Sequence, residues 1–540
     1  MASVSFTYNG DYDPQNTVSL RQNAFTIVYI GINSPYVIYD SGSTFAFNNY
    51  SDRSQGGFHF SDSNRTTEFG DFKKLNAQEY SLNFDFSDNI EVVNFTGGNF
   101  GDILRGGAGN DILTGGGGND LLEGGVGGDS FDGGSGTDTV SYEHSSAGVT
   151  VSFIPFLSNA GDAQGDTFAD IEKFRGSELN DTFFGANSTY VFEGGGGADA
   201  ILSLNGTDVA SYEHSPTSVT VNLFTGNNTG GDAEGDTLTS IQYVQGSAFA
   251  DSLTGNDSDN ILRGGGGADT LDGGLGDDRL VITETPTDID GGAGTDTLFV
   301  LGGRTVALTD TNFAGIETVY VRDDTTLDMS GVSTGQVIIS QSIASTNTTS
   351  HGSDITGTTG DDTITAGRGE DTIHGAGGSD AIRGGSGFAT IYGDADNDTL
   401  IAGNGGAFLS GGSGEDTLRG GSGAQNSLFG GSGNDRIVAG SGGATIEGGA
   451  GTDKLFAGVG SDTFTFAGNY GRDEILRFDL NNDSLDVSNF ANGIGDVHFA
   501  SVHDGRDTLI TFAGDTDASH KIIVHNIAAA TLEDQGHFIF

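Results

Sequence analysis

Aspartates recur every nine residues through much of this chain. Between residues 102 and 138 each one follows a glycine-rich turn and precedes a triplet with a large apolar residue in its middle, as in RGGAGNDILTGGGGNDLLEGG. Carboxylate oxygens, with the backbone carbonyl oxygens that glycine leaves accessible, are the ligands of a hard cation such as Ca²⁺. The spacing therefore predicts a series of calcium sites. With nearby carbonyl groups of the glycine turns, the predicted ligands are Asp102, Asp111, Asp120, Asp129, Asp138, Asp181, Asp199, Asp208, Asp251, Asp269, Asp278, Asp296, Asp362, Asp371, Asp380, Asp398, Asp416, Asp435, Asp453 and Asp462.

The same nine residues indicate the elements that must position these carboxylates. The triplet is a minimal strand with one inward side chain, and the glycine-rich half can turn sharply because glycine reaches positive φ without steric cost. Two units make one coil, and stacked coils build two parallel sheets with a spacing of about 4.8 Å. Each Asp then lies against the Asp two units further on, where the two carboxylates repel each other unless a cation lies between them. We therefore predict an all-β protein of parallel β-rolls, or β-solenoids.

At these residues the chain resembles the RTX family of secreted calcium-binding repeat proteins. The resemblance implies a β-roll in which each Ca²⁺ is shared between turns two repeats apart. Residues 460–490, GSDTFTFAGNYGRDEILRFDLNNDSLDVSNF, resemble the β-rich cap that follows such rolls, and the ending GHFIF is similar to an uncleaved C-terminal export signal. The resemblance thus also implies type I secretion from a Gram-negative bacterium, to the extracellular space or the cell surface.

The phase of the repeat divides the chain into blocks. A longer period overlies it, because SYEHSSAGVTVSF from Ser141 matches SYEHSPTSVTVNL from Ser211, and we expect these two related segments to leave the roll as small β-excursions. The predicted order is an N-terminal β-domain (1–96), an RTX roll (97–141), a β-insertion (142–180), a short roll (181–211), the duplicated insertion (212–250), an RTX roll (251–297), a β-rich spacer (298–356), a long RTX roll (357–465), and a C-terminal β-cap with the secretion signal (466–540).

Two motifs in the insertions carry further polar side chains. YEH places Glu143 beside His144, and Glu213 beside His214, but neighbours in a strand point to opposite faces, so we favour a structural role over a catalytic one. The loops GDAQGDT and GDAEGDT leave two interpretations open, an additional calcium site or an acidic turn. Their candidate ligands are Asp162, Asp166, Asp232 and Asp236.

The long roll shows an alternation of its own. Successive repeats turn at opposite edges of a roll, so one edge carries Asp at positions 362, 380, 398, 416, 435 and 453. The other edge has lost its carboxylates at Ala389, Ala407, Asn426 and Ala444. We infer an ion ladder on the first edge and a largely ion-free second edge, which could pack, with Phe388 and Phe408, on another element or another molecule.

The remaining segments carry few signals. The first residues lack a charged n-region and an apolar h-region, so we expect no Sec-type signal peptide, and no apolar run reaches the length of a membrane span. Residues 1–96 contain strand-like runs but no recognised motif. His498 and His503, like His520 and His525, are five apart and should face opposite sides of a strand, so we expect no metal site from either pair.

Composition narrows the function. Asp and Glu number 75 against 21 Lys and Arg, which gives a net charge of −54 and disfavours binding to nucleic acid or to an anionic membrane surface. The absence of Cys excludes disulfides and Cys-ligated zinc. The chain has neither the H-E-x-x-H motif of RTX proteases nor the G-x-S-x-G motif of RTX lipases, so we expect no enzyme, with the question left open for residues 1–96.

These observations favour an extracellular repeat protein that folds on Ca²⁺ after export and acts structurally at the cell surface, as a self-assembling component of a surface layer or matrix. An alternative is an adhesin or polysaccharide-binding protein with its contact site in residues 1–96. A third, less favoured alternative is a solenoid enzyme such as a polysaccharide epimerase. The expected partners are Ca²⁺, the type I export machinery, and either further copies of the chain or a cell-surface polysaccharide.

Overall fold

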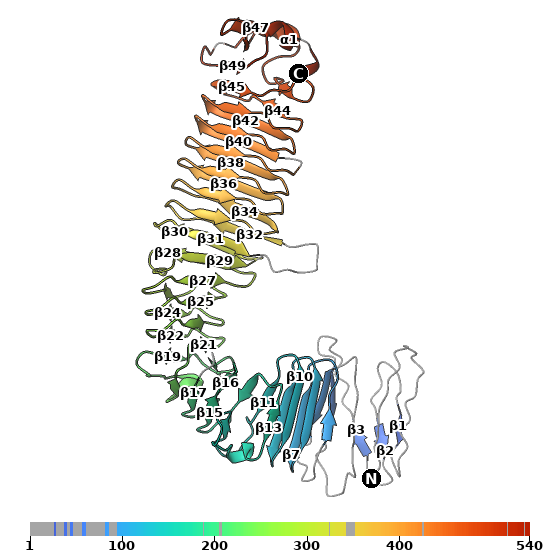
Figure 1. Cartoon of the computed structure of the whole chain (residues 1–540), viewed down its shortest axis with the longest axis vertical. Coiled ribbons are helices and arrows are strands. Elements are labelled where there is room, and N and C mark those ends of the chain that lie inside the picture. The colour runs from blue at the N-terminus through green and yellow to red at the C-terminus, as the bar shows by residue number, and fades with distance from the viewer. Residues whose placement is uncertain are drawn as a thin grey trace. The chain divides into compact units, whose positions relative to one another are not determined.

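The protein is an all-β solenoid. The computed structural model describes residues 94–540 except 187, 205–207, 323, 342–350, 424–425, 516 and 534, and within residues 1–93 it describes only the backbone of five strands. Strands make up 46% of the chain and coil into a parallel β-solenoid of about 21 turns (Figure 1). The chain forms two compact units, Met1–Leu253 and Thr254–Phe540, which are described in turn. Within the described residues, no helix has the length and apolar character needed to cross a bilayer.

The first unit has one continuous parallel sheet and shorter sheets facing it. The continuous sheet contains β7 (Ile103–Ala108), β9 (Leu121–Val126), β11 (Thr139–Ser141), β14 (Lys173–Arg175), β16 (Val191–Glu193), β18 (Val209–Ser211) and β21 (Tyr243–Gln245). The facing sheets contain β6 (Asn94–Thr96), β8 (Ile112–Gly117), β10 (Ser130–Ser135) and β13 (Thr167–Ala169), then β12 (Thr150–Ser152), β15 (Thr182–Gly185), β17 (Ala200–Ser203) and β20 (Thr237–Thr239). β19 (Thr220–Asn222) and β22 (Ser252–Thr254) are neighbours in a further sheet.

The predicted N-terminal domain of residues 1–96 falls largely outside the described residues. Of its strands, β1 (Thr26–Val28), β2 (Val37–Tyr39) and β3 (Thr44–Ala46) form an antiparallel sheet. By contrast, β4 (Gly57–Phe60) pairs in parallel with β5 (Ser81–Asp85), and β5 pairs in parallel with β7. The continuous sheet of the roll therefore begins before residue 97, inside the segment predicted as a separate domain.

The second unit has two long parallel sheets, called sheet I and sheet II below. Sheet I contains β23 (Ile261–Arg263), β25 (Arg279–Ile282), β27 (Thr297–Val300), β29 (Thr318–Arg322), β31 (Val337–Gln341), β33 (Thr363–Thr365), β35 (Ala381–Arg383), β37 (Thr399–Ile401), β39 (Thr417–Arg419), β41 (Arg436–Val438), β43 (Lys454–Phe456) and β45 (Arg472–Leu476). Sheet II contains β28 (Thr305–Thr309), β30 (Thr326–Gly331), β32 (His351–Thr356), β34 (Glu370–His374), β36 (Ala389–Ala395), β38 (Ala407–Ser413), β40 (Asn426–Gly433), β42 (Ala444–Gly451), β44 (Thr463–Thr465), β46 (Ser484–Asp486) and β50 (Phe538–Ile539). A shorter parallel pair, β24 (Thr270–Asp272) and β26 (Asp288–Asp290), precedes sheet II.

The core is a pair of apolar files, one from each sheet. The middle residue of each triplet points inward and stacks on its counterpart in the next coil, as Ile382 does on Leu400 and Leu400 on Leu418. All three are completely buried, as are Ile391 and Leu409 in the facing sheet. Because most strands of the long roll supply only one large buried apolar residue, no coil there can bury its own core, and stability must come from stacking.

The glycine turns have the backbone that the sequence predicts. At the turn before Asp435, Gly431 has φ 113° and Gly433 has φ 136°. These angles lie in the region that only glycine enters without steric cost, so the GGxG pattern is a requirement of the turn.

Residues 142–180 and 212–250 do not leave the roll, and the predicted β-excursions are wrong at this point. In the first segment, β12 pairs with β15, and β14 pairs with both β11 and β16, all in parallel. The 3₁₀ turns η1 (Gly161–Ala163) and η2 (Gly231–Ala233) occupy equivalent places in the two segments. Each segment therefore contains coils whose length differs from that of the nonapeptide coils. These coils lack the nonapeptide sequence but continue the apolar files.

The predicted spacer of residues 298–356 is also part of the solenoid. Its strands pair in parallel from coil to coil: in sheet I β27 pairs with β29 and β29 with β31, and in sheet II β28 pairs with β30 and β30 with β32. Val319 and Leu327 are completely buried and continue the apolar files. Stacking of these files holds this part of the roll without aspartates in phase.

A β-rich cap closes the C-terminal end. β45 pairs in parallel with β49 (Lys521–Val524), which pairs antiparallel with β48 (Asp507–Phe512), and β48 pairs antiparallel with β47 (Val497–Val502). The short elements η3 (Ile494–Asp496), α1 (Ala529–Leu532) and η4 (Gln535–His537) complete it. The final strand, β50, pairs with β46 at the end of sheet II.

Candidate metal centre

The predicted aspartates form ladders along the edges of the roll. All twenty are buried, and none is more than 3% exposed. In the long roll each Asp donates its backbone N–H to Oδ1 of the next Asp along the edge, from Asp380 to Asp398 and from Asp398 to Asp416 at 2.8 Å, and from Asp416 to Asp435 at 2.9 Å. This contact fixes each carboxylate in place and brings successive carboxylates into one row.

The second carboxylate oxygen in these rows lacks a protein partner. Among the residues that the structure describes, Oδ2 is buried without a hydrogen-bond partner in Asp120, Asp129, Asp138, Asp199, Asp208, Asp278, Asp296, Asp380, Asp398, Asp416 and Asp435. A buried polar atom without a partner costs about 1–3 kcal/mol, and more when it is charged. A repeated cost of this kind indicates that another group completes these sites.

The glycine turns leave a space for that group. A Cβ at Gly393 would overlap both Oδ2 of Asp398 and the carbonyl oxygen of Gly411 in the next coil, and a Cβ at Gly411 would meet Asp416 and Gly430 in the same way. A carboxylate oxygen and a backbone carbonyl oxygen therefore converge beside each first glycine of a turn. Oxygen donors alone fit Ca²⁺, so the residues present fit the predicted ion.

The electrostatics agree with this donor set. Burial and the neighbouring carboxylates together raise the pKa of Asp380 to about 8 and the pKa of Asp398 to about 7, against the lowering effect of the N–H of the preceding Asp. In the first unit the same causes raise the pKa of Asp120 to about 7 and of Asp199 to about 8. Without a cation, the carboxylates of the row must either take up protons or repel one another.

Six of the twenty aspartates differ from the others in the contact that their Oδ2 makes. In each of them Oδ2 accepts the backbone N–H of the residue four positions earlier, as Asp362 accepts that of Thr358 at 2.6 Å. This contact closes the turn from within the chain. The residues of this kind are Asp102, Asp181, Asp251, Asp362, Asp371 and Asp462.

Of the four acidic residues in the loops of the two insertions, two belong to the ladders and two do not. Asp166 accepts the N–H of Asp129 at 2.7 Å, and Asp236 accepts the N–H of Asp199 at 2.7 Å, so both continue ladders across the longer coils. Their Oδ2 atoms accept the hydroxyl protons of Tyr142 and Tyr212, at 2.7 Å and 3.0 Å. The other two candidates, Asp162 and Asp232, lie half-buried on η1 and η2, outside the row of hydrogen bonds.

The remaining YEH side chains form ion pairs on the surface. His144 Nδ1 lies 2.8 Å from Glu123 Oε1, and Arg105 Nε lies 2.7 Å from Glu123 Oε2. The duplicate is equivalent, with His214 and Arg175 on Glu193. Because each carboxylate already has a cationic partner, this cluster supports the structural interpretation.

Several ladder carboxylates were not predicted from the sequence, because they do not lie at the nine-residue spacing of the repeat. Glu172 accepts the N–H of Asp138 at 2.8 Å, and Glu317 accepts that of Asp296 at 2.6 Å. Both follow an Ile and precede a strand triplet, in DIEKF and GIETV, and this pattern is the signal that could have found them. Asp483 accepts the N–H of Asp462 at 3.0 Å.

Asp473 is the most unusual of the residues that were missed. It is completely buried in the first strand of the cap, and burial with the neighbouring Asp453 raises its pKa to about 10. It lies where the long ladder ends, so a second carboxyl group meets the last ladder Asp. We know of no signal in the sequence that distinguishes it from a surface Asp.

The comparison with protein families points to the same ion. The family model for the RTX calcium-binding nonapeptide repeat (4 copies) matches residues 96–131, 118–140, 245–280, 356–391, 374–409, 392–424 and 429–464. No curated protein matches the chain. Among solved structures, the AlgE6R3 subunit of the Azotobacter vinelandii mannuronan C5-epimerase is 25% identical, with 35% of this chain and 77% of that chain covered and a TM-score of 0.15. The extracellular lipase LipA of Serratia marcescens is 15% identical, with 47% and 45% covered and a TM-score of 0.17. The repeats in these matched segments are therefore RTX calcium-binding nonapeptide repeats, and they support an RTX-type protein.

Proposed function

We propose that this chain is an extracellular, non-enzymatic repeat protein that folds on Ca²⁺ after export and acts structurally at the cell surface, as a self-assembling component of a surface layer or matrix. The observation that carries the proposal is the row of buried Oδ2 atoms without protein partners. Such a row is tolerable only with protons or cations bound, so the fold depends on the calcium concentration around it.

The residues account for a folding switch. At low Ca²⁺ the stacked carboxylates repel, and the glycine-rich chain, with one apolar residue per strand, gains too little from burial to offset its conformational entropy. The unfolded state suits passage through a type I export channel. Outside the cell Ca²⁺ supplies the missing positive charge, and the free energy of binding becomes free energy of folding.

An exposed aromatic row on sheet II supports self-association. His374 stacks on Tyr392 with ring centroids 4.5 Å apart, and the rings of Phe408 and Phe429 follow at 5.6 Å and 5.2 Å. These four side chains are half-buried and lie on the outer face, at the middle of the long roll. A row of this kind can pack against the same row of a second copy.

Electron microscopy of the purified chain tests this function. In millimolar Ca²⁺ we expect ordered sheets or filaments that dissolve after chelation, and in a Tyr392→Ser, Phe408→Ser double variant we expect calcium-folded but dispersed particles. Serine at these outer positions leaves the apolar files intact, so circular dichroism of the variant should match the parent. Monodisperse particles of the parent in both conditions would disprove self-assembly.

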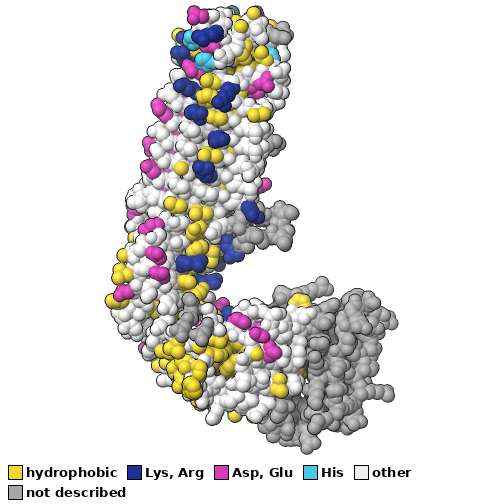
Figure 2. Space-filling view, in the orientation of Figure 1, with side chains coloured by type: hydrophobic (Ala, Val, Ile, Leu, Met, Phe, Trp, Pro, Cys, Tyr) yellow, Lys and Arg dark blue, Asp and Glu magenta, His cyan; other side chains and the backbone are white. Residues whose placement is uncertain are grey.

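A second candidate function, binding of an acidic polysaccharide, is favoured by the outer face of sheet I. Six of the 21 Lys and Arg residues lie in two adjacent columns of this face, and between β23 and β43 these columns hold no carboxylate. Figure 2 shows dark blue and yellow side chains alternating along this unit. The six cations, called the basic stripe below, are Arg263, Arg279, Arg383, Arg419, Arg436 and Lys454.

The chemistry of the stripe suits a chain of acidic sugars. Arg279 lies over the ring of Phe299 at 4.4 Å, Phe299 stacks on Tyr320 at 4.9 Å, and a hollow of about 320 Å³ opens beside them. Guanidinium groups bind carboxylates through paired hydrogen bonds, while exposed aromatic and aliphatic side chains pack on the apolar faces of sugar rings. In this candidate function the polysaccharide contact lies on the roll, whereas the sequence favoured residues 1–96, whose side chains lie almost entirely outside the described residues.

Titration calorimetry with oligogalacturonate at constant Ca²⁺ tests the stripe. We expect binding to the acidic oligosaccharide and none to neutral dextran, and we expect Arg419→Gln to weaken binding several-fold. Arg304→Gln removes the same charge from an exposed residue that pairs with Glu284 outside the stripe, and it should bind as the parent does. Equal loss in both variants, or tighter binding of DNA than of the oligouronate, would overturn this assignment.

A further inference from the structure

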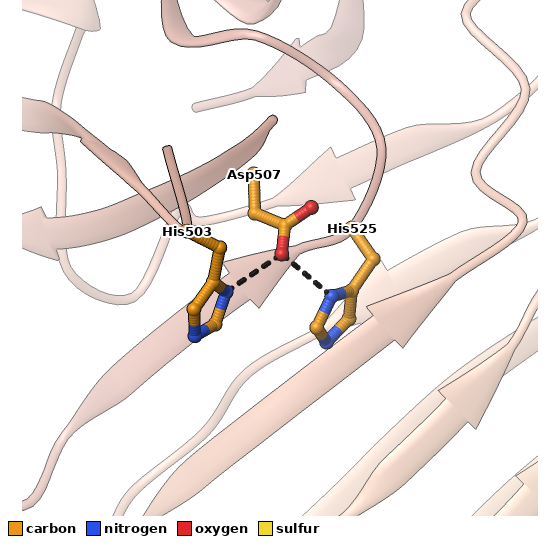
Figure 3. A group of neighbouring side chains, drawn as sticks. All are labelled: His503, Asp507 and His525. Carbon is orange, nitrogen blue, oxygen red and sulfur yellow. Dashed lines mark hydrogen bonds and ion pairs between the residues drawn. The ribbon is translucent and has the colours of Figure 1, made fainter. Parts of the chain in front are cut away.

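A cluster in the C-terminal cap joins residues that the sequence analysis separated. His503 lies in the turn between β47 and β48, Asp507 begins β48, and His525 follows β49. We expected no metal site because the histidines of each pair are five apart. The fold instead brings one histidine from each pair to a single carboxylate, and Figure 3 shows both rings approaching the same oxygen of Asp507.

The geometry of this cluster is that of three convergent ligands. His503 Nδ1 lies 2.7 Å and His525 Nδ1 lies 3.0 Å from Oδ2 of Asp507. The three donor atoms all lie within 4.8 Å of one another, and the two imidazole rings are parallel to within 3°. Two nitrogens and one oxygen at this separation can close around one ion with small side-chain movements.

We propose that His503, Asp507 and His525 form a binding site for Zn²⁺ or a similar divalent transition metal, distinct from the calcium ladders. Imidazole nitrogen and carboxylate oxygen are ligands of Zn²⁺, whereas Ca²⁺ takes oxygen ligands almost alone. Three protein ligands leave a fourth tetrahedral position, which water can fill because the His503 side chain is 53% exposed.

Surrounding groups hold the ligands in place. Oδ1 of Asp507 accepts the backbone N–H of Asn526 at 2.8 Å, which leaves Oδ2 for the imidazoles. Nε2 of His525 lies 3.5 Å from Oε2 of Glu474, on the side away from Asp507. A carboxylate on the far nitrogen favours the tautomer that carries its proton on Nε2, so that Nδ1 can exchange its contact with Asp507 for a metal ion, as in many zinc sites.

Another histidine of the cap shows what a purely structural arrangement looks like. His520 has Nδ1 2.9 Å from Asp515 and Nε2 3.0 Å from Asn469, and its ring stacks on Tyr470 at 4.4 Å. Its two nitrogens contact two different protein groups, and among the described residues no second histidine converges on Asp515, so no set of three ligands forms here. In the cluster of Glu123, Glu143 and His144, Arg105 pairs with Glu123 and Arg175 pairs with Glu143, so both carboxylates are already neutralised.

Zinc titration of the full chain, already saturated with millimolar Ca²⁺, tests the proposal. We expect one Zn²⁺ per chain that Ca²⁺ does not displace, and a Co²⁺ complex with the visible absorption of a tetrahedral site. His503→Asn, which keeps a residue suited to the positive φ of 48° at this position, and His525→Gln should each weaken binding at least tenfold. Glu474→Gln should weaken it 10- to 100-fold through the orientation of His525.

His498→Gln is the matched control, because it removes an exposed histidine of β47 outside the cluster and should leave zinc binding unchanged. Circular dichroism in Ca²⁺ verifies that each variant folds. Zinc that is displaced by Ca²⁺, or that binds equally well to the His503→Asn and His525→Gln variants, would assign the ion to the acidic ladders and overturn the proposal.

Discussion

The two edges of the long roll solve the same stacking problem differently. On one edge, from Asp362 to Asp453, each backbone N–H of a ladder Asp is bonded to the carboxylate of the next coil. On the other edge, Ala389, Ala407 and Ala444 occupy the equivalent positions, equally buried, and the strands of sheet II begin at these residues. The first edge thus contains charges that must be neutralised along its whole length, whereas the second contains none between Asp371 and Asp462.

Asn426 shows how the second edge dispenses with an ion. Its Nδ2 donates hydrogen bonds to the carbonyl oxygens of Gly423 and Gly443, at 2.9 Å and 3.2 Å. An amide here provides the positive partner that carbonyl oxygens would otherwise find in a cation. A coil of this roll can therefore form without Ca²⁺ at the edge that carries Asn426. Calcium dependence arises from the carboxylate ladder on the opposite edge.

Of the changes considered, removal of Ca²⁺ should destabilise the fold most, because it acts on every ladder at once. With chelator at pH 7.5 we expect loss of most β-structure, because every ladder loses the charge that balances it, and each site at 100 times its Kd contributes about 2.7 kcal/mol. Circular dichroism and thermal melts with and without chelator measure this effect. A melting temperature that stays constant after chelation would show that the ladders are neutral without ions.

Acid should substitute in part for the missing cation. The folded-state pKa is about 8 for Asp380 and about 7 for Asp398 and Asp435, above the value of about 3.8 for an unperturbed Asp, so the metal-free folded state binds more protons than the unfolded state. Stability therefore falls as pH rises through this range and is regained as pH decreases toward 4.

Melts of the chelated chain between pH 4 and pH 8 measure this dependence, and the same series in Ca²⁺ is its control. We expect the dependence to reverse in Ca²⁺, since protons and the ion compete for the same oxygens. Stability of the chelated chain that increases with pH would contradict the protonated ladder.

A charge-matched pair of substitutions locates the effect on one edge. Asp398→Asn keeps an oxygen that can accept the N–H of Asp380 and puts an amide where Oδ2 faces the glycine carbonyls, as Asn426 does on the other edge. We expect a folded protein that binds less Ca²⁺ and melts lower in Ca²⁺, by about 1–3 kcal/mol of unfolding free energy. Calorimetric calcium titration and thermal melts measure both.

Asp396→Asn is the control for this substitution, because Asp396 is exposed in the same turn and asparagine tolerates its φ of 74°. It removes the same charge, so general electrostatics predict the same result for both. An equal loss of calcium in the two variants would exclude a specific site at Asp398.

The sequence predicted the repeating parts of this molecule well because their geometry is local. The triplet, the turn and the stacking of Asp398 under Asp416 all follow from nine residues and a period of eighteen, and the family comparison confirms the RTX repeats and the β-solenoid class. The role of these residues as calcium ligands stays a prediction that the unpartnered oxygens support.

The sequence failed where coils change length or where distant segments meet. Residues 142–180 look like an insertion because their phase is lost, yet burial of Val149 and Val151 keeps them in the roll. Asp473 and the pairing of His503 with His525 depend on how the cap folds back, and no period in the sequence encodes that. Hydrophobic stacking tolerates variable coil lengths, whereas pattern matching does not.

Conversion of Asn426 to Asp is the smallest change that could give the second edge the calcium dependence of the Asp362–Asp453 edge. Asn426→Asp replaces the Nδ2 donor with a carboxylate oxygen that faces the carbonyl groups of Gly423 and Gly443. In chelator this should destabilise the fold, by about 1–3 kcal/mol for a buried polar group that has lost its partner. In millimolar Ca²⁺ the loss should shrink, because Asp462 follows further along the same edge and the new carboxylate can share an ion with the surrounding carbonyls.

The measurement is the difference in melting temperature between calcium and chelator. Asn426→Asp should widen this difference, whereas Asn426→Ala, with the side chain found at Ala444, should not. If the two substitutions gave the same difference, a carboxylate in the slot would be insufficient for calcium dependence, and the glycine turn of the first edge would have to supply the rest.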